Sequence, residues 1–189
     1  MAIPSIWKIV LIDDEEDIRE VMAVALQDAG YTVETAADGA TGIERCAAIY
    51  PQIVITDIRM PGISGLQVLE TIKGKFPDIE VIVVTAFGEM DLAIRALQLD
   101  ASDFVTKPIS DEALNLALKR AKNRFTSRKQ LKDYTTILEK EKAETSQELL
   151  RNIAFQRNLI ESSMDGILAC DENNIVVIFN RSMEKMLNY

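Results

Sequence analysis

The stretch Ile53-Val54-Ile55-Thr56-Asp57-Ile58-Arg59-Met60-Pro61-Gly62 decides the fold. Four β-prone residues precede Asp57, and they predict a short buried strand. The Pro61-Gly62 pair turns the backbone, so Asp57 is expected where the strand meets solvent. A carboxylate there can act as a nucleophile, although an isolated aspartate after an apolar run is equally consistent with a residue that only caps the loop. The rest of the chain must decide between these two interpretations.

Apolar runs of the same kind recur along the first two thirds of the chain and alternate with segments of helical periodicity. Solid apolar strands that alternate with helices predict a parallel sheet covered on both faces. We therefore predict a five-stranded, doubly wound α/β fold with strand order 2-1-3-4-5. The predicted strands are 7–12, 31–36, 53–57, 81–85 and 104–105, and the predicted helices are 18–26, 40–50, 64–76, 91–99 and a last one capped by Ser110.

Polar residues end four of these strands. Asp13 and Asp14 follow the first strand, and Asp57 ends the third, so the three carboxylates should meet where the strand order reverses. Thr85 and Lys107 end the fourth and fifth strands at the same edge. Each has an ordinary structural explanation, but their joint position indicates one site. Carboxylates about 4 to 5 Å apart would repel by roughly 3 to 4 kcal/mol per pair, so a cation is expected, and oxygen ligands favour Mg²⁺.

Composition excludes several classes of function. The 189-residue chain contains no histidine, which excludes histidine metal sites, Ser-His and Cys-His catalysis, and a phosphohistidine on this chain. It has no apolar stretch long enough to span a membrane and no signal peptide, so we expect a cytoplasmic protein. Cys46 and Cys170 lack metal or redox spacing and are expected to be buried thiols.

Residues 3 to about 122 resemble the receiver domain of two-component response regulators, and we predict a domain over 1–124. The resemblance implies the flavodoxin-like form of the fold, and that Asp57 accepts a phosphoryl group from a phosphohistidine on a histidine kinase or phosphotransfer protein. It also implies Lys107 as the partner of the phosphoryl oxygens. The implied Mg²⁺ ligands are Asp13, Asp57, Asp14 partly through water, and the Arg59 backbone carbonyl. The residues that carry the resemblance are Asp13-Asp14, Asp57 before Met60-Pro61-Gly62, Thr85-Ala86, and Phe104 before Lys107-Pro108.

The residues that form the family's conformational switch also have counterparts in this sequence. The resemblance implies that Thr85 moves toward the phosphoryl oxygen and that Phe104 rotates into the vacated space beside the small Ala86. It also makes Lys107-Pro108 a candidate cis peptide. Two residues depart from the family pattern. Phe104 replaces the commoner tyrosine, which leaves the strength of the switch open, and Asp100 replaces a glycine, at an expected cost of at most about 1 to 2 kcal/mol.

The chain beyond Ser110 has no proline or glycine until Gly166, which allows one helix of about 50 residues. Residues 119–132 hold seven basic and no acidic side chains, and we expect a solvated helical face rather than a nucleic-acid site. We predict a helical linker over 125–157 and a parallel homodimer through residues of about 120–160. Two apolar sets have coiled-coil spacing and are separated by a break in the heptad: Leu131, Tyr134 and Leu138, then Leu149, Ile153, Gln156 and Ile160.

Residues 158–189 resemble the N-terminal part of a PAS sensor domain, which is an α+β fold. The expected elements are an entry helix, a hairpin with 172–174 in its turn, and a second helix. The resemblance implies that the receiver passes its state through the helix to a PAS-containing output.

Three other functions compete with the receiver. A phosphatase of the haloacid-dehalogenase type also forms an aspartyl phosphate, but it needs a second aspartate two residues after the nucleophile, where this chain has Arg59. A flavin carrier of the same fold needs a Ser/Thr phosphate-binding loop after the first strand, where this chain has acidic residues. A phosphorylation-silent module is disfavoured because every acidic and basic site residue is present. The only chemistry we expect is self-phosphorylation and autodephosphorylation, and membership of a larger sensor kinase stays open.

Overall fold

The computed structural model describes residues 6–188. The chain divides into two compact units, Met1–Asp133 and Tyr134–Tyr189. The predicted boundaries of the receiver at residue 124 and of the linker at residue 157 stay predictions. Residues 1–5 of the predicted receiver and Tyr189 of the predicted PAS fragment lie outside the described residues.

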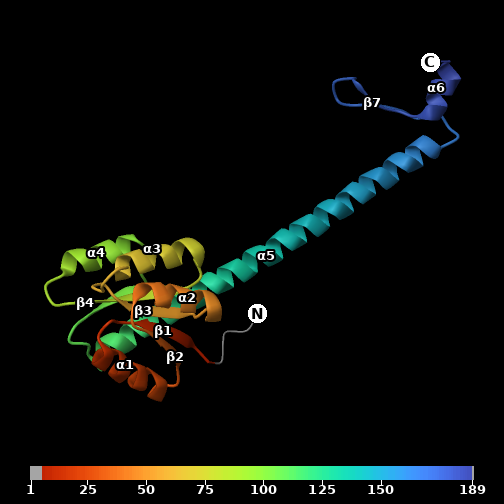
Figure 1. Ribbon diagram of the computed structural model, residues 1–189. Helices are drawn as coiled ribbons and strands as arrows, with labels where there is room; N and C mark the ends of the chain where they lie inside the picture. The colour runs from red at the N-terminus through yellow and green to blue at the C-terminus, as the bar shows by residue number, and fades with distance from the viewer. Residues whose placement is uncertain (1–5, 189) are drawn as a thin grey trace. The chain divides into compact units, whose positions relative to one another are not determined.

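The first unit contains a five-stranded sheet in the order β2-β1-β3-β4-β5, as predicted (Figure 1). All neighbouring strands are parallel, and Asp57 at the end of β3 lies opposite Val84 of β4. The sheet therefore brings the carboxyl ends of β1, β3, β4 and β5 to one edge. The strands are β1 Lys8–Ile12, β2 Thr32–Ala36, β3 Ile53–Asp57, β4 Glu80–Thr85 and β5 Asp103–Thr106.

Helices cover both faces of this sheet (Figure 1). Alternate strand residues pack into two buried clusters: one includes residues of α2, α3 and α4, and the other residues of α1 and the start of α5. Such two-sided burial explains why β3 and β4 read as solid apolar runs. The helices are α1 Glu16–Asp28, α2 Gly39–Ile49, α3 Gly65–Lys75, α4 Met90–Gln98 and α5 Asp111–Ser162.

Turn chemistry in the loops of this unit follows the sequence closely. Ser64 caps α3 in a full capping box with Gln67, and Gly62 takes a left-handed conformation with φ of 78°. Asp100 is also left-handed, with φ of 68°, as its position after α4 predicted. The Lys107-Pro108 peptide is cis, as predicted.

Helix α5 is continuous over 52 residues, which confirms the predicted long C-terminal helix. The basic run at 119–132 is solvated in part, as predicted, since Lys119, Arg120 and Lys132 are exposed. Several of its side chains also contact residues of other segments, which we did not predict. Within the described residues, no helix is both long enough and apolar enough to cross a membrane.

The second unit contains the end of α5, an antiparallel hairpin of β6 (Leu168–Cys170) and β7 (Val176–Phe179), and α6 (Arg181–Leu187). The fully buried Asn180 joins them: its amide donates to the carbonyls of Ile160 and Asp165, and its side-chain oxygen accepts from the Ile167 amide. The predicted helix, hairpin and second helix are thus all present.

The two cysteines differ in environment. Cys46 is buried under the sheet, as predicted, and burial raises the pKa of its thiol to about 12. The prediction for Cys170 was wrong. This residue is exposed, because it ends a three-residue strand of a two-stranded sheet that leaves one side of the strand uncovered.

Candidate functional site

Asp57 is held where β3 turns into the loop before α3. The amide of Ile58 donates to the Val84 carbonyl, and the amide of Gly65 donates to the Ile58 carbonyl, so the backbone is fixed on both sides of the turn. Asp57 is 6% exposed. Its carboxylate accepts a hydrogen bond of 3.2 Å from the Arg59 amide.

The structure brings the three predicted carboxylates together. Ligand oxygens of Asp13, Asp14 and Asp57 all lie within 4.8 Å of one another, with Asp13 and Asp57 buried and Asp14 exposed. The separation matches a site that one hard cation could bridge. The predicted carbonyl ligand from Arg59 stays a prediction.

Lys107 reaches the same point from the end of β5. Its Nζ lies 2.6 Å from Asp57 Oδ2, 3.3 Å from Asp13 Oδ2 and 3.1 Å from Glu15 Oε1. Burial opposes the charge of Lys107, but hydrogen bonds to Asp57 and Glu15 outweigh it, so the pKa of this ammonium is raised. The lysine stays protonated between the carboxylates.

The cluster keeps an excess of negative charge. Burial raises the pKa of Asp13, and the charge of Asp57 raises it further, against the lowering effects of the Glu15 amide and Lys107. Four carboxylates, of Asp13, Asp14, Glu15 and Asp57, face one ammonium, which leaves three formal negative charges. The donor set and its charge therefore fit a divalent cation.

The switch residues lie beside this cluster, with a partner that we did not predict. The Thr85 hydroxyl donates to Glu89 Oε2 at 3.2 Å, and the Ala86 amide donates to the same oxygen at 3.3 Å. Glu89 is the N-cap residue of α4, and its other oxygen forms an ion pair with Arg59 Nε. The hydrogen bond from Arg59 is the main cause of the lowered pKa of Glu89. Glu89 thus holds the Thr85 hydroxyl in this state.

Phe104 lies on β5 and is half-buried. It packs against the cluster that includes residues of α2, α3 and α4. Its predicted rotation remains a prediction. Glu15 and Glu89 are the two site residues that sequence reasoning missed. The only available signals were the position of Glu15 in the acidic run and of Glu89 just before a helix.

Known proteins match the part of the chain that forms this site. The family model "response regulator receiver domain" matches residues 9–119. The transcriptional regulatory protein DctD of Rhizobium meliloti is 37% identical over 123 residues, which cover 65% of this chain and 26% of DctD. FixJ of Azorhizobium caulinodans is 29% identical over 87% of this chain and 74% of its own length.

A solved structure has the same fold. The receiver domain protein from Clostridium thermocellum superposes with a TM-score of 0.61 at 34% identity, and the match covers 63% of this chain and 96% of that protein. By contrast, the chain spans only about a quarter of the length of relatives such as DctD.

Proposed function

The chain belongs to the response regulator receiver domain family, and from this membership we propose that Asp57 accepts a phosphoryl group from a phosphohistidine of a histidine kinase or phosphotransfer protein. The position of Asp57 carries the proposal: a buried carboxylate ends β3 within 2.6 Å of the Lys107 ammonium. An oxygen of Asp57 would form the new P–O bond while the P–N bond to the donor imidazole breaks. Lys107 would then pair with the phosphoryl oxygens.

Mg²⁺ would be held by the carboxylates of Asp13, Asp14 and Asp57 and by the Arg59 carbonyl. When bound, the ion supplies the positive charge that an anionic donor and an in-line phosphoryl transfer require. The three uncompensated negative charges of the cluster support this assignment.

The bond between Thr85 and Glu89 gives the switch a resting state. A phosphoryl group on Asp57 adds a charge of about −1.5 to −2 and offers the Thr85 hydroxyl a stronger acceptor than Glu89. If the Thr85 hydroxyl turned to the phosphoryl group, it would release Glu89 at the start of α4. Phe104 would then rotate into the space beside Ala86. We expect the change to reach α4, β5 and the start of α5.

Arg59 argues against a phosphatase of the haloacid-dehalogenase type. That chemistry requires an acid two residues after the nucleophile, whereas the side chain here is a guanidinium that is 72% exposed and paired with Glu89. A phosphorylation-silent module would not need a lysine that contacts three carboxylates.

The output would be a PAS-containing segment that begins near residue 158. The hairpin, the second helix and the buried Asn180 that links them to α5 support a compact sensory module. The named relatives DctD and FixJ are transcriptional regulatory proteins.

Phosphate uptake tests the proposed function. We expect the 189-residue chain to take up one phosphate from a small phosphodonor such as acetyl phosphate, and only with a divalent cation. Asp57→Asn should abolish uptake, whereas the matched control Asp28→Asn, an exposed acid on α1, should retain it. Uptake by Asp57→Asn, or undiminished uptake in excess chelator, would refute the assignment.

We also propose that two chains pair in parallel through α5. Tyr134, Leu138, Leu149 and Ile153 are between 45% and 60% exposed in the single chain, along one long helix. A helix with such an apolar stripe is unstable in water, and pairing removes the exposure. The heptad break between Leu138 and Leu149 would locally unwind the pair.

Molecular mass in solution tests this pairing. At tens of micromolar we expect a dimer for the full chain and for a chain cut after Ser163, and a monomer for a chain cut after Asp133. The cut after Ser163 removes the hairpin, whose open edges could associate by themselves. A monomeric full chain, or a dimer that persists without residues 134–189, would contradict a helix-driven dimer.

A further inference from the structure

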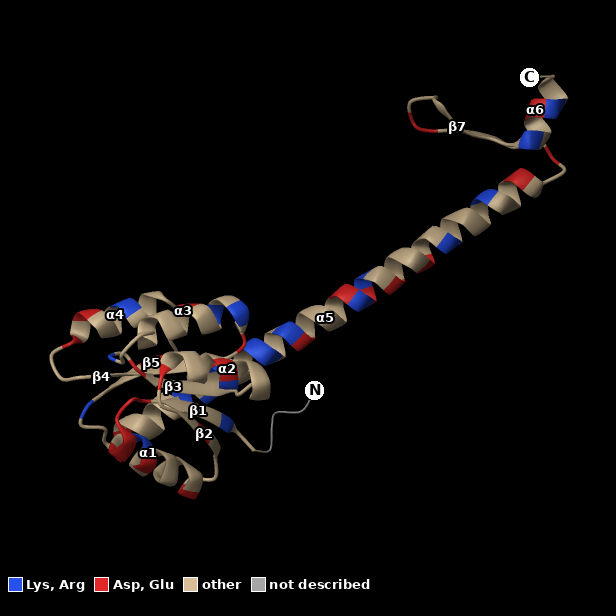
Figure 2. Cartoon of the chain, in the orientation of Figure 1, with Lys and Arg blue, Asp and Glu red and all other residues tan. Residues whose placement is uncertain are grey.

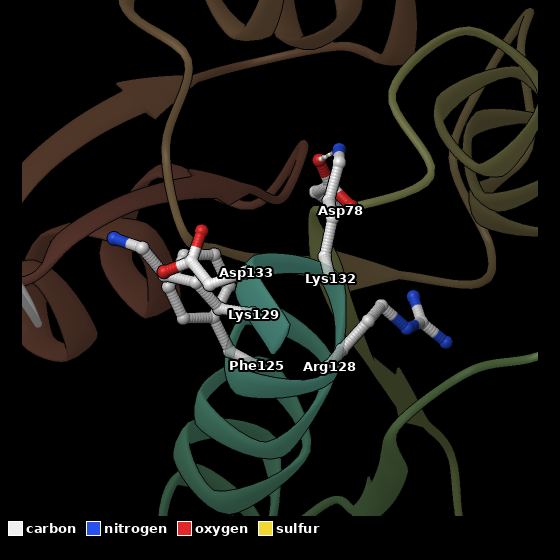
Figure 3. A pocket seen from close by; sticks show the side chains of 6 residues that line it. All are labelled: Asp78, Phe125, Arg128, Lys129, Lys132 and Asp133. Atoms are coloured by element: carbon white, nitrogen blue, oxygen red, sulfur yellow. Dashed lines mark hydrogen bonds and ion pairs between the residues drawn. The ribbon is translucent and has the colours of Figure 1, made fainter. Parts of the chain in front are cut away.

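A stripe of basic side chains on α5 packs, within the first unit, against the end of the sheet opposite Asp57. Arg120, Arg124, Arg128 and Lys132, which we call the basic stripe, recur every four residues and so share one face of the helix. Figure 2 shows blue residues along this part of α5, and Figure 3 shows Lys132 beside Asp78. The stripe is about 18 Å long at 1.5 Å per residue.

Each member of the stripe pairs with an acidic residue that lies outside α5. Arg120 Nη1 lies 2.9 Å from Asp103 Oδ2 on β5, and Lys132 Nζ lies 2.9 Å from Asp78 Oδ2 before β4. Between them, Arg124 and Arg128 both bind Asp100, which follows α4. The stripe therefore connects α5 with β5 and with the loops that precede β4 and β5 at this end of the sheet.

Asp100 is the centre of this arrangement. One carboxylate oxygen accepts from Arg124 Nη2 and the other from Arg128 Nη2, at 3.2 Å. Its left-handed backbone, with φ of 68°, would suit glycine better. The hydrogen bonds of its carboxylate with the two arginines offset the cost of that conformation. Burial disfavours its charge, but hydrogen bonds from the two arginines and the charge of Lys73 outweigh this, so the pKa of Asp100 is lowered.

Glu80 makes the contact costly to open. This carboxylate is fully buried at the start of β4 and accepts a 2.5 Å hydrogen bond from Ser102. Its cations are Lys73 at 3.6 Å, Arg124 at 3.6 Å and Arg128 at 3.5 Å. Its Oε1 has no hydrogen-bond partner among the described residues, so the Arg128 contact is an ion pair only. If α5 moved away, the buried Glu80 carboxylate would keep Lys73 as its only cation among those three and the hydrogen bond from Ser102, and the loss of two cations is strongly unfavourable.

Helix α4 lies between the two ends of this system. Its N-cap Glu89 binds Thr85 and Arg59 beside the candidate site, and Asp100 follows its C-terminal end. A rigid helix of nine residues that shifts at one end shifts at the other, because packed elements move as units.

We propose that Asp100 passes the state of the receiver from α4 to the linker part of α5 through Arg124 and Arg128. The proposal rests on the proposed function, since phosphorylation supplies the input. Asp100, Arg124 and Arg128 are positioning residues here and touch no reacting atom. Four of the seven basic side chains at 119–132 thus pair with acids of their own chain.

Amide hydrogen exchange on the full chain tests this relay, with beryllofluoride and Mg²⁺ as the probe of the phosphorylated state. In the parent chain, exchange should change around residues 57–89 and also at 124–133. In Asp100→Asn, which keeps the left-handed conformation accessible, residues 57–89 should respond as before and residues 124–133 should not. Without the probe, Asp100→Asn should exchange about tenfold faster at 124–133, because two charged hydrogen bonds are weakened.

Asp91→Asn is the matched control, since Asp91 is an exposed acid in the first turn of α4, and it should behave as the parent chain. A parent chain with no response around residue 57 would overturn the proposed function. A site that responds, with 124–133 responding equally in the parent and in Asp100→Asn, would overturn the relay alone.

Discussion

Replacing Gly65 by alanine should cost about 3 kcal/mol or more of the free energy of unfolding. A Cβ on Gly65 would lie 2.0 Å from the Asp57 carbonyl oxygen and 2.8 Å from the Asp57 carbonyl carbon. Both are backbone atoms, and β3 is hydrogen-bonded to strands on both sides, so neither can move aside cheaply. The same close approach fixes Asp57 at the end of its strand. Gly65→Ala should therefore also impair phosphate uptake by whatever fraction remains folded.

Gly74→Ala in the same helix is the matched control. Gly74 is an exposed helical residue with nothing within 4 Å of an added Cβ, so alanine should raise stability by about 0.5 to 1 kcal/mol. Urea unfolding of the three chains, with the slope compared to verify two-state behaviour, gives both differences. A Gly65→Ala chain within 1 kcal/mol of the parent would show that the turn after β3 is not as closely packed as described.

Lys107→Ala should slow phosphate uptake by about 100-fold or more at saturating Mg²⁺. The ammonium contacts Asp57, Asp13 and Glu15, and no other cation contacts Asp57 in the described part of the chain. Its loss makes the formal charge of the cluster more negative, from minus three to minus four, so a dianionic donor meets greater repulsion. The conformational response to beryllofluoride should weaken for the same reason.

Lys119→Ala is the control for a general loss of positive charge, since Lys119 is exposed on α5. It should take up phosphate at the parental rate. An uptake rate for Lys107→Ala within threefold of the parent, in a chain whose unfolding midpoint is unchanged, would contradict the role assigned to this lysine.

The sheet and the carboxylate cluster could be predicted from the sequence, because short stretches of the chain indicate each strand and the residue that ends it. Strands β3 and β4 are buried on both faces, so each contains a continuous apolar run, Ile53–Ile55 and Val81–Val84, that stands out in the sequence. Parallel strands place their carboxyl ends at one edge, which unites Asp13 and Asp57 without knowledge of their distance. The sharp turn at Gly62 also has a direct sequence signature.

Charge pairing across the fold could not be predicted in the same way. Glu80 is completely buried, yet at the start of an apolar run it reads as a solvated end residue. Its burial depends on arginines that reach it from α5, more than forty residues along the chain. The same holds for the basic run at 119–132. Its composition is that of an exposed helix face, yet several of its side chains pair with acids of other segments. Periodicity reports which face is apolar and carries no information on which charges meet.

Glu89 shows the same limit at the site itself. Nothing in the stretch from Thr85 to Glu89 distinguishes a carboxylate that binds the Thr85 hydroxyl from one that only begins a helix. Its role depends on Arg59, which a different loop presents. Resemblance to receivers indicated Thr85 as the switch residue, and the structure adds Glu89 as the acceptor of its hydroxyl hydrogen bond.

The most direct test of the central claim is to locate the phosphoryl group on the chain. After incubation with acetyl phosphate and Mg²⁺, borohydride reduction converts an aspartyl phosphate to homoserine, and peptide mass spectrometry then identifies the modified residue. The account predicts homoserine at position 57 and unmodified aspartate at positions 13 and 14, with no conversion in a sample that lacks the phosphodonor. Conversion at position 13 or 14, or an unmodified Asp57 in a chain that has taken up phosphate, would contradict it.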